Sequence, residues 1–191
     1  MIPVQPQPEP PEFHQRVRVP GQDFLMTNPS PKQDDWDGKE HWRRAIPDLR
    51  IAYRGICAYS SLRILPIEVA TVDHFVPRKT HPHLAYEWSN FRLARHRINS
   101  KKGEFTVLDP FTIGDDWFVL DFSTFMVHPN NNLTEVQMGQ IRETIQRLDL
   151  NHQDYVEMRA EWYTEFKNNL QALERYSPFI AYEMRRQEIV P

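Results

Sequence analysis

The sequence has almost none of the residues that cross-link small secreted proteins. Only one cysteine, Cys57, occurs among the 191 residues, which excludes a disulfide within the chain and favours a reducing compartment. No apolar run approaches the roughly 20 residues that a membrane-spanning helix needs. The first residues also lack the apolar core of a signal peptide. These absences predict a cytoplasmic protein that does not insert into a membrane.

A strong excess of charge of one sign is also missing. The net charge is −3, so the bulk field of the chain does not attract a polyanion. The charge is nevertheless uneven, because residues 75–102 contain seven lysines and arginines against Glu87 alone, a net charge of +6. A basic patch on an acidic background is typical of phosphate contact at one site.

Length and composition predict a folded domain after an extended segment. Hydrophobic residues make up 40% of the chain and aromatic residues 12%, which is typical of globular proteins. Residues 1–31 hold eight of the sixteen prolines. Because proline fixes φ and removes a backbone donor, we expect this segment to be extended, and a single domain to span residues 32–191. The segment is either a tail on the domain or in solvent, or an arm that docks on a partner. Its apolar anchors would be Val17, Val19, Phe24 and Leu25.

Helices and short strands are predicted on both sides of the central region. Residues 34–54 are expected to be helical, with Asp34 or Asp35 as the cap and Pro47 as an interruption. Two short strands are predicted, at Phe105–Leu108 and Trp117–Phe122.

The last third of the chain has the apolar spacing of helices. Thr134 and Gln137 form a capping-box pattern. Ile141, Ile145 and Leu148 then recur on one helix face. We therefore expect helices over residues 133–189, and their apolar faces are predicted to form core.

Polar side chains with the potential for catalysis are spaced between Cys57 and Gly103. Asp73 and His74 follow a short apolar run that predicts a strand, and Asn90 comes sixteen residues after His74 in a polar turn. Asn99 comes nine residues after Asn90, where a basic, helix-like segment ends. A strand, a loop and a short helix could bring these four side chains together around one divalent metal ion and one general base.

The order Asp-His, then Asn, then Asn-x-x-Lys-Gly resembles the HNH endonucleases, also known as ββα-metal nucleases. Here it is supplied by Asp73-His74, Asn90 and residues 99–103, and the Asn90-to-Asn99 interval resembles that of the HNH domain in RNA-guided CRISPR nucleases. The resemblance covers about a quarter of the chain. It implies an α+β fold with a ββα-metal core at about residues 51–105, short flanking strands and a C-terminal helical region.

The resemblance also implies an activity, the metal-dependent hydrolysis of DNA phosphodiester bonds. Asp73 and Asn99 would hold Mg²⁺ or Mn²⁺, His74 would be the general base, and Asn90 would brace the loop beside it. The residues expected to contact nucleic acid are Arg92, Arg95, Arg97, Lys101 and Lys102.

A weaker resemblance extends to residues 108–111 and 144–151. These stretches look like HNH proteins that are paired with ATPases in bacterial phage defence, such as the Septu type. They imply the nuclease subunit of an antiviral defence complex with an ATPase partner. The alternative is a catalytically inactive HNH-like module that binds nucleic acid or a protein.

The sequence departs from the zinc-binding members of this family. Many HNH proteins carry two Cys-x-x-Cys pairs, whereas the matching positions here are Cys57, Ser60, Arg95 and Ile98. Four-coordinate zinc cannot be built from them, so we expect no structural zinc, and packing of the flanking regions must replace it. Another metal site at His81, His83 and His96 is an alternative to a simple loop.

Overall fold

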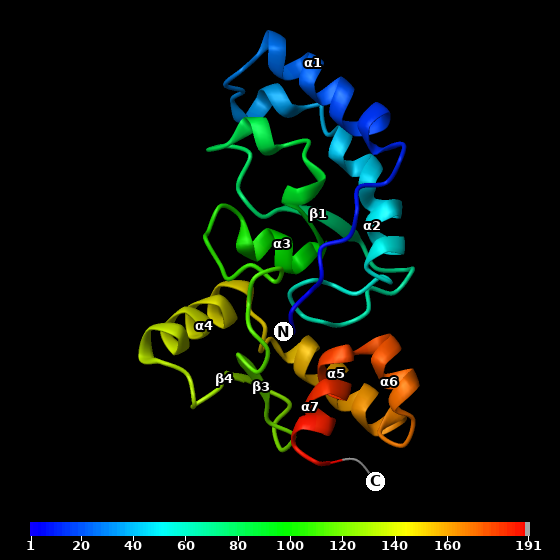
Figure 1. The fold of residues 1–191 in the computed structure, drawn as a ribbon, viewed down its shortest axis with the longest axis vertical. Coiled ribbons are helices and arrows are strands. Elements are labelled where there is room, and N and C mark those ends of the chain that lie inside the picture. The colour runs from blue at the N-terminus through cyan, green and yellow to red at the C-terminus, as the bar shows by residue number, and fades with distance from the viewer. Residues whose placement is uncertain (190–191) are drawn as a thin grey trace.

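Two antiparallel strands and a short helix lie at the centre of the structure (Figure 1). The computed structural model describes residues 1–189, and the last two residues of the predicted domain lie outside that range. Strand β1 spans Ala70–His74, β2 spans Phe91–Arg95, and helix α3 spans His96–Lys102. The two strands form a sheet of their own, in which Asp73 lies opposite Arg92 and His74 opposite Phe91. These three elements follow one another in the order strand, strand, helix within a mixed α+β fold, and a ββα-metal core stays a prediction.

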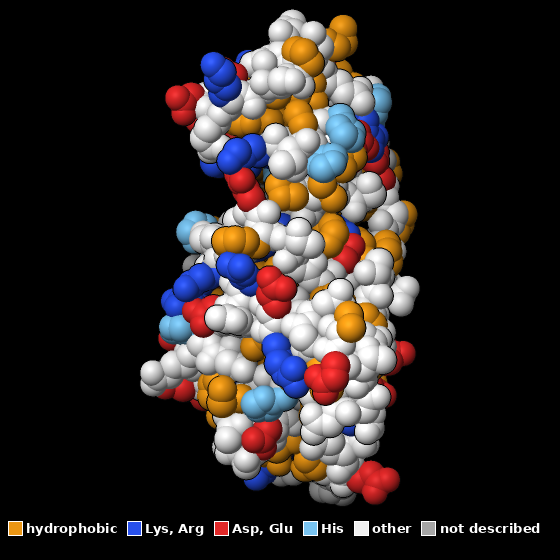
Figure 2. Space-filling model, turned by 90° about the vertical axis from the view of Figure 1, so that its left-hand side faces the viewer, with side chains coloured by type: hydrophobic (Ala, Val, Ile, Leu, Met, Phe, Trp, Pro, Cys, Tyr) orange, Lys and Arg blue, Asp and Glu red, His pale blue; other side chains and the backbone are white. Residues whose placement is uncertain are grey.

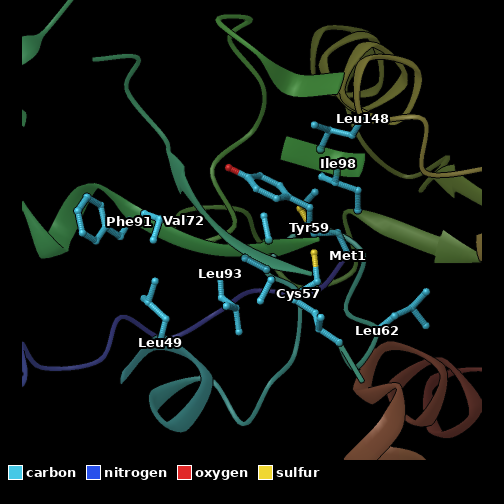
Figure 3. Packing of buried hydrophobic residues seen from close by; sticks show 14 of the residues in the cluster. Met1, Leu49, Cys57, Tyr59, Leu62, Val72, Phe91, Leu93, Ile98 and Leu148 are labelled. Carbon is cyan, nitrogen blue, oxygen red and sulfur yellow. The ribbon is translucent and has the colours of Figure 1, made fainter. Parts of the chain in front are cut away.

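The two faces of this hairpin are covered by different helices. Because neighbouring side chains of a strand point to opposite faces, Thr71 and Asp73 face α3, where Asn99 and Lys102 contact them. Val72 and His74 face the other way, toward helix α2, which spans Ile46–Ala52. Figure 3 shows the same division, with Tyr59 and Ile98 on one side of the strands and Leu49 and Leu93 on the other. The strand is thus buried on both faces.

The N-terminal segment differs from its prediction. Residues 1–10 contain neither helix nor strand, but residues 14–27 are helical, with a π-helical turn η1 at His14–Arg18 followed by α1 at Val19–Thr27. Pro20 lies in the first turn of α1, where the missing N–H would have no intrahelical partner anyway. The extended segment predicted for residues 1–31 is therefore wrong over its second half, because proline density alone does not distinguish a helix start from a break.

The same segment is packed onto the hairpin. Phe13 is fully buried, with its ring 5.5 Å from Trp88 and 5.7 Å from Phe91 in edge-to-face contact. Gly21 lies so close to Tyr86 that a Cβ atom there would come within 2.1 Å of the ring. The first residues are tied down as well, since the Trp88 indole donates to the carbonyl of Gln7 at 2.8 Å. The tail belongs to the core of the fold.

Short helical turns replace the single helix predicted at residues 34–54. The structure has a 3₁₀ turn η2 at Gln33–Trp36, a second turn η3 at His41–Ala45, and then α2. Pro47 lies at the start of α2 rather than in its middle. Two further 3₁₀ turns, η4 at Pro82–Leu84 and η5 at Trp88–Asn90, lie between β1 and β2.

The remainder of the chain forms a second small sheet and four helices (Figure 1). These elements are β3 at Phe118–Leu120, β4 at Val127–Pro129, α4 at Glu135–Leu148, α5 at Gln153–Phe166, α6 at Leu170–Tyr176 and α7 at Pro178–Arg186. The capping box of Thr134 and Gln137 is present. The strand predicted at residues 105–108 is not formed. Within residues 1–189, no helix has both the length and the apolar character needed to cross a bilayer.

Candidate active site

A pocket lies along the outer edge of β1. The strand pairs with β2 on one side only, so its other edge is free of strand pairing. The pocket is bordered by three groups of residues. The first is Val69 together with β1, and the second is His96, Asn99 and Ser100 of α3. The third, opposite them, is Trp42, Arg43 and the segment from Pro77 to Lys79. Residues from both faces of β1 therefore reach one opening.

His74 is fixed in orientation and kept neutral. Its ring lies edge-on against Trp42 at 4.9 Å and Phe91 at 5.3 Å, and its Nε2 atom lies 2.9 Å from the carbonyl oxygen of Ala85. Because a carbonyl oxygen only accepts hydrogen bonds, Nε2 must carry the proton and Nδ1 must carry the lone pair. Burial lowers the pKa of His74 to about 4. The ring is thus an uncharged imidazole with one acceptor nitrogen at neutral pH.

Asn90 braces the loop that orients His74. Its side-chain oxygen accepts from the Val76 N–H at 2.8 Å, and its amide nitrogen donates to the carbonyls of Val76 at 3.0 Å and Leu84 at 3.1 Å. Leu84 immediately precedes Ala85, the residue that fixes the His74 ring. Asn90 is buried and does not reach the pocket. Its hydrogen bonds hold together the segments that flank the His74 ring, and the role of Asn90 as a brace for a catalytic base stays a prediction.

Asp73 is bound to protein groups on both of its oxygens. The hydroxyl of Tyr59 donates to one oxygen, and the ammonium of Lys102 lies 3.1 Å from the other. The carboxylate is only 1% exposed. Burial raises the pKa of Asp73, while the neighbouring Lys102 opposes that rise. Lys102 also donates to the carbonyls of His74 and Phe75, so all three of its donors are used.

The predicted metal ligands do not form a metal site in this arrangement. The amide nitrogen of Asn99 donates to Thr71 and to the carbonyl of Val72, both at 3.1 Å, which leaves its side-chain oxygen as an acceptor at the pocket. Each oxygen of Asp73 already has a protein partner, the Tyr59 hydroxyl for one and the Lys102 ammonium for the other. Within residues 1–189, no group of three histidine, cysteine or acidic side chains is arranged to hold a metal ion. As placed, this donor set does not fit a divalent cation.

Three of the five residues predicted to contact nucleic acid are buried instead. The guanidinium of Arg92 makes two hydrogen bonds to Asp109, at 2.8 and 2.7 Å. Arg95 pairs with Glu68, and Lys102 is fully buried beside Asp73. These assignments are wrong, because all three side chains form ion pairs with carboxylates that lie far away in the sequence.

Arg97 and Lys101 remain on the surface, where each has an acidic neighbour. Their side chains are 42% and 51% exposed, and both lie near Asp149, at 3.3 and 3.5 Å. Basic and acidic side chains are interspersed on the face of the molecule shown in Figure 2. The local charge of +6 counted along the sequence is therefore not a continuous basic surface.

Three residues of this region are absent from the sequence-based prediction. Tyr59 and Trp42 contact Asp73 and His74 respectively, and Arg78 borders the pocket. Arg78 lies four residues after His74, within the basic stretch, so its position could have indicated it as a candidate site residue. Nothing in the local sequence connects Trp42 or Tyr59 to the motif, because both come from elsewhere in the chain.

No protein-family model matches the chain, and no curated protein sequence matches it. The resemblance to HNH endonucleases therefore rests on the spacing of Asp73, His74, Asn90 and Asn99 alone, and membership of that family stays a prediction.

Proposed function

We propose that this protein is an endonuclease of the HNH type that hydrolyses DNA phosphodiester bonds, with His74 as the general base. The observation that supports this most is the fixed imidazole, which donates through Nε2 to the Ala85 carbonyl and presents Nδ1 as an acceptor. A general base must accept a proton in a set direction.

The proposed reaction begins when Nδ1 of His74 takes a proton from a water molecule. The water oxygen attacks the phosphorus, and the bond from phosphorus to the leaving 3′ oxygen breaks. That oxygen keeps the electron pair of the bond and takes a proton from solvent water. Asn90 keeps the Leu84–Ala85 carbonyls in place, so the imidazole retains its orientation during the proton transfer. The low pKa of the ring means that it is ready to accept a proton at pH 7 without first losing one.

The metal implied by the resemblance is a separate element of the proposal. A bound Mg²⁺ or Mn²⁺ would supply Lewis-acid stabilisation at the scissile phosphate and the leaving oxygen. Asn99 offers an acceptor oxygen, but Asp73 can become a ligand only when Lys102 leaves it. The ATPase partner and the role in phage defence stay predictions of the resemblance.

A second candidate is an HNH-like module that binds without cutting. The ion pair between Lys102 and Asp73 favours it, because an internal ammonium in place of a metal suits a fold that has lost catalysis. This candidate leaves the orientation of His74 unexplained.

Plasmid nicking distinguishes the two. Wild-type protein and His74→Ala, purified identically, are incubated with supercoiled DNA in Mg²⁺, Mn²⁺ or EDTA. We expect the wild type to nick and His74→Ala to lose about 10²–10⁴-fold in rate, with unchanged DNA binding. Equal nicking by both proteins would reject His74 as the base, and no nicking by the wild type in any metal would favour the binding module.

A further inference from the structure

Among the residues that line the pocket, Arg78 has the features of a substrate-binding group. We infer that its guanidinium binds a phosphate oxygen of the nucleic acid, beside the His74 imidazole and on the same tryptophan ring. This inference rests on the proposed function and deepens it, because it assigns the phosphate contact that the buried arginines cannot make.

Arg78 differs from its basic neighbours in having no acidic partner. Seven lysines and arginines occur between residues 75 and 102. Six of them pair with a carboxylate: Lys79, Arg92, Arg95, Arg97, Lys101 and Lys102. Within residues 1–189, Arg78 makes no salt bridge, and its Nε atom is buried without a hydrogen-bond partner. A partly buried guanidinium with unused donors is costly unless a ligand satisfies it.

The acids closest to Arg78 are already engaged. Glu40 pairs with Arg43 at 3.2 Å, and Glu104 pairs with Lys79 at 3.0 Å. Both acids influence Arg78 through space, but neither comes within bonding distance of it. The guanidinium therefore lies near the opening of the pocket, and neither of these carboxylates contacts it directly.

Aromatic rings hold the guanidinium in position. The central carbon of Arg78 lies 5.0 Å from the Trp42 ring centroid and 5.4 Å from that of Trp36. Trp42 also contacts His74 at 4.9 Å, so one indole supports both the proposed base and the arginine. Stacking on rings holds the planar group while leaving N–H donors at its edge for a ligand.

The chemistry of this arrangement matches a phosphate. An arginine fork binds two oxygens of a phosphate at once, which a lysine cannot do. Hydrolysis by a base at His74 builds negative charge on the phosphate oxygens, so a fixed cation at this place would bind the substrate and stabilise that charge.

DNA binding tests the inference without requiring cleavage. A fluorescein-labelled DNA duplex is titrated in EDTA, by fluorescence anisotropy over a range of salt concentrations, with wild type, Arg78→Met, Arg78→Lys and His74→Ala. The salt slope is the change in the logarithm of the binding constant with the logarithm of the salt concentration. Removing one phosphate contact lowers the magnitude of this slope by about one. Loss of a charged hydrogen bond should weaken binding by at least about tenfold. We expect both changes in Arg78→Met, weaker binding with an unchanged slope in Arg78→Lys, and an unchanged slope in His74→Ala, because the ring that it removes is uncharged.

Arg147→Met is the matched control. Arg147 also stacks on an aromatic ring, with its central carbon 4.0 Å from the Phe105 centroid, and it lies outside the pocket. The same charge is removed, so a nonspecific electrostatic effect would appear equally in both variants. If Arg78→Met fails to fold, as judged by circular dichroism, Arg78→Lys provides the comparison.

The outcomes separate this inference from the proposed function. Four results would each overturn the role of Arg78. They are wild-type affinity and salt slope in Arg78→Met, losses of equal size in Arg147→Met, wild-type affinity in Arg78→Lys, and no DNA binding by the wild type. Binding that depends on Arg78, in a protein that never nicks DNA, would support the phosphate site and reject the endonuclease.

Discussion

Replacing Lys102 with methionine tests the most unusual feature of the candidate site. The Lys102 side chain is fully buried and donates to Asp73 at 3.1 Å, to the His74 carbonyl at 2.9 Å and to the Phe75 carbonyl at 3.1 Å. Methionine keeps most of the apolar stem but removes the charge. The variant would leave the Asp73 carboxylate buried, with Tyr59 as its remaining donor.

The expected loss of stability is large. Removing one partner of a buried ion pair costs about 3–5 kcal/mol, because the other charge is left uncompensated. In a chain of this size each kcal/mol lowers Tm by about 2–4 °C, so the fall should be roughly 6–20 °C. The exposed neighbour Lys101 gives the control, since Lys101→Met should change the free energy of unfolding by about 0.5 kcal/mol or less.

Thermal melts with and without Mn²⁺ then connect the ion pair to metal binding. A carboxylate freed from Lys102 can bind a cation together with Asn99, and a ligand that binds only the folded state raises Tm. Mn²⁺ should therefore stabilise Lys102→Met more than the wild type, and adding Asp73→Asn should abolish that difference.

Two results would refute this reasoning. A Lys102→Met protein that melts within a degree or two of the wild type would mean that the ion pair contributes nothing. Equal stabilisation of both proteins by Mn²⁺ would mean that a metal reaches its ligands without displacing Lys102.

Four further predictions follow from the site and its supports. Because the pKa of His74 is about 4 and only the neutral ring accepts a proton, nicking should persist at pH 5 and fall as the pH approaches 4; a pH–rate profile with its midpoint near 6.5 would contradict the burial. Asn90→Ala should lower the nicking rate by loosening the loop, and a Mn²⁺ titration should give the same metal affinity as the wild type. Phe13→Ala should cost about 3–5 kcal/mol, measured by urea denaturation, whereas a dispensable tail would show no change. Elemental analysis should find far less than one zinc per chain, since Cys57 is the only cysteine.

The central elements could be predicted because their signals are local. A short apolar run that ends at Val72 indicated a strand next to Asp73 and His74, where the structure has β1, and Thr134 with Gln137 marked the start of α4 through a capping box that the structure contains. Each of these signals depends on neighbours within a few residues. Asn90 also acts locally, through hydrogen bonds to the loop directly before it.

The surroundings of the site could not be predicted, because they depend on partners distant in the sequence. The sequence predicts that Arg92, Arg95 and Lys102 contact nucleic acid, yet their partners Asp109, Glu68 and Asp73 lie 17, 27 and 29 residues away. Charge counted along a segment does not tell which cations will be buried. The helix at residues 14–27 was missed for a related reason, since tertiary packing on the hairpin overrode the effect of the prolines.

The four positions at which the resemblance to HNH proteins would place zinc-binding cysteines lie inside the fold. Cys57, Ser60, Arg95 and Ile98 are all at most 6% exposed. The turn after Cys57 is joined to β2 by the Ala58 N–H, which donates to the Leu93 carbonyl at 2.8 Å. Zinc would hold such a turn to the hairpin by bonds to four ligands.

Here the guanidinium of Arg95 takes part in holding this turn to the hairpin. The guanidinium of Arg95 donates to the carbonyl of Arg63 at 2.6 Å, pairs with Glu68, and contacts Met158 on α5. Met1 packs over Cys57 from the other end of the chain (Figure 3). The burial of Arg95, which keeps it away from the surface where DNA would bind, thus gives one of the contacts between the hairpin and the C-terminal helices. A single arginine cannot serve both purposes, and this is why phosphate contact in our proposal falls to Arg78.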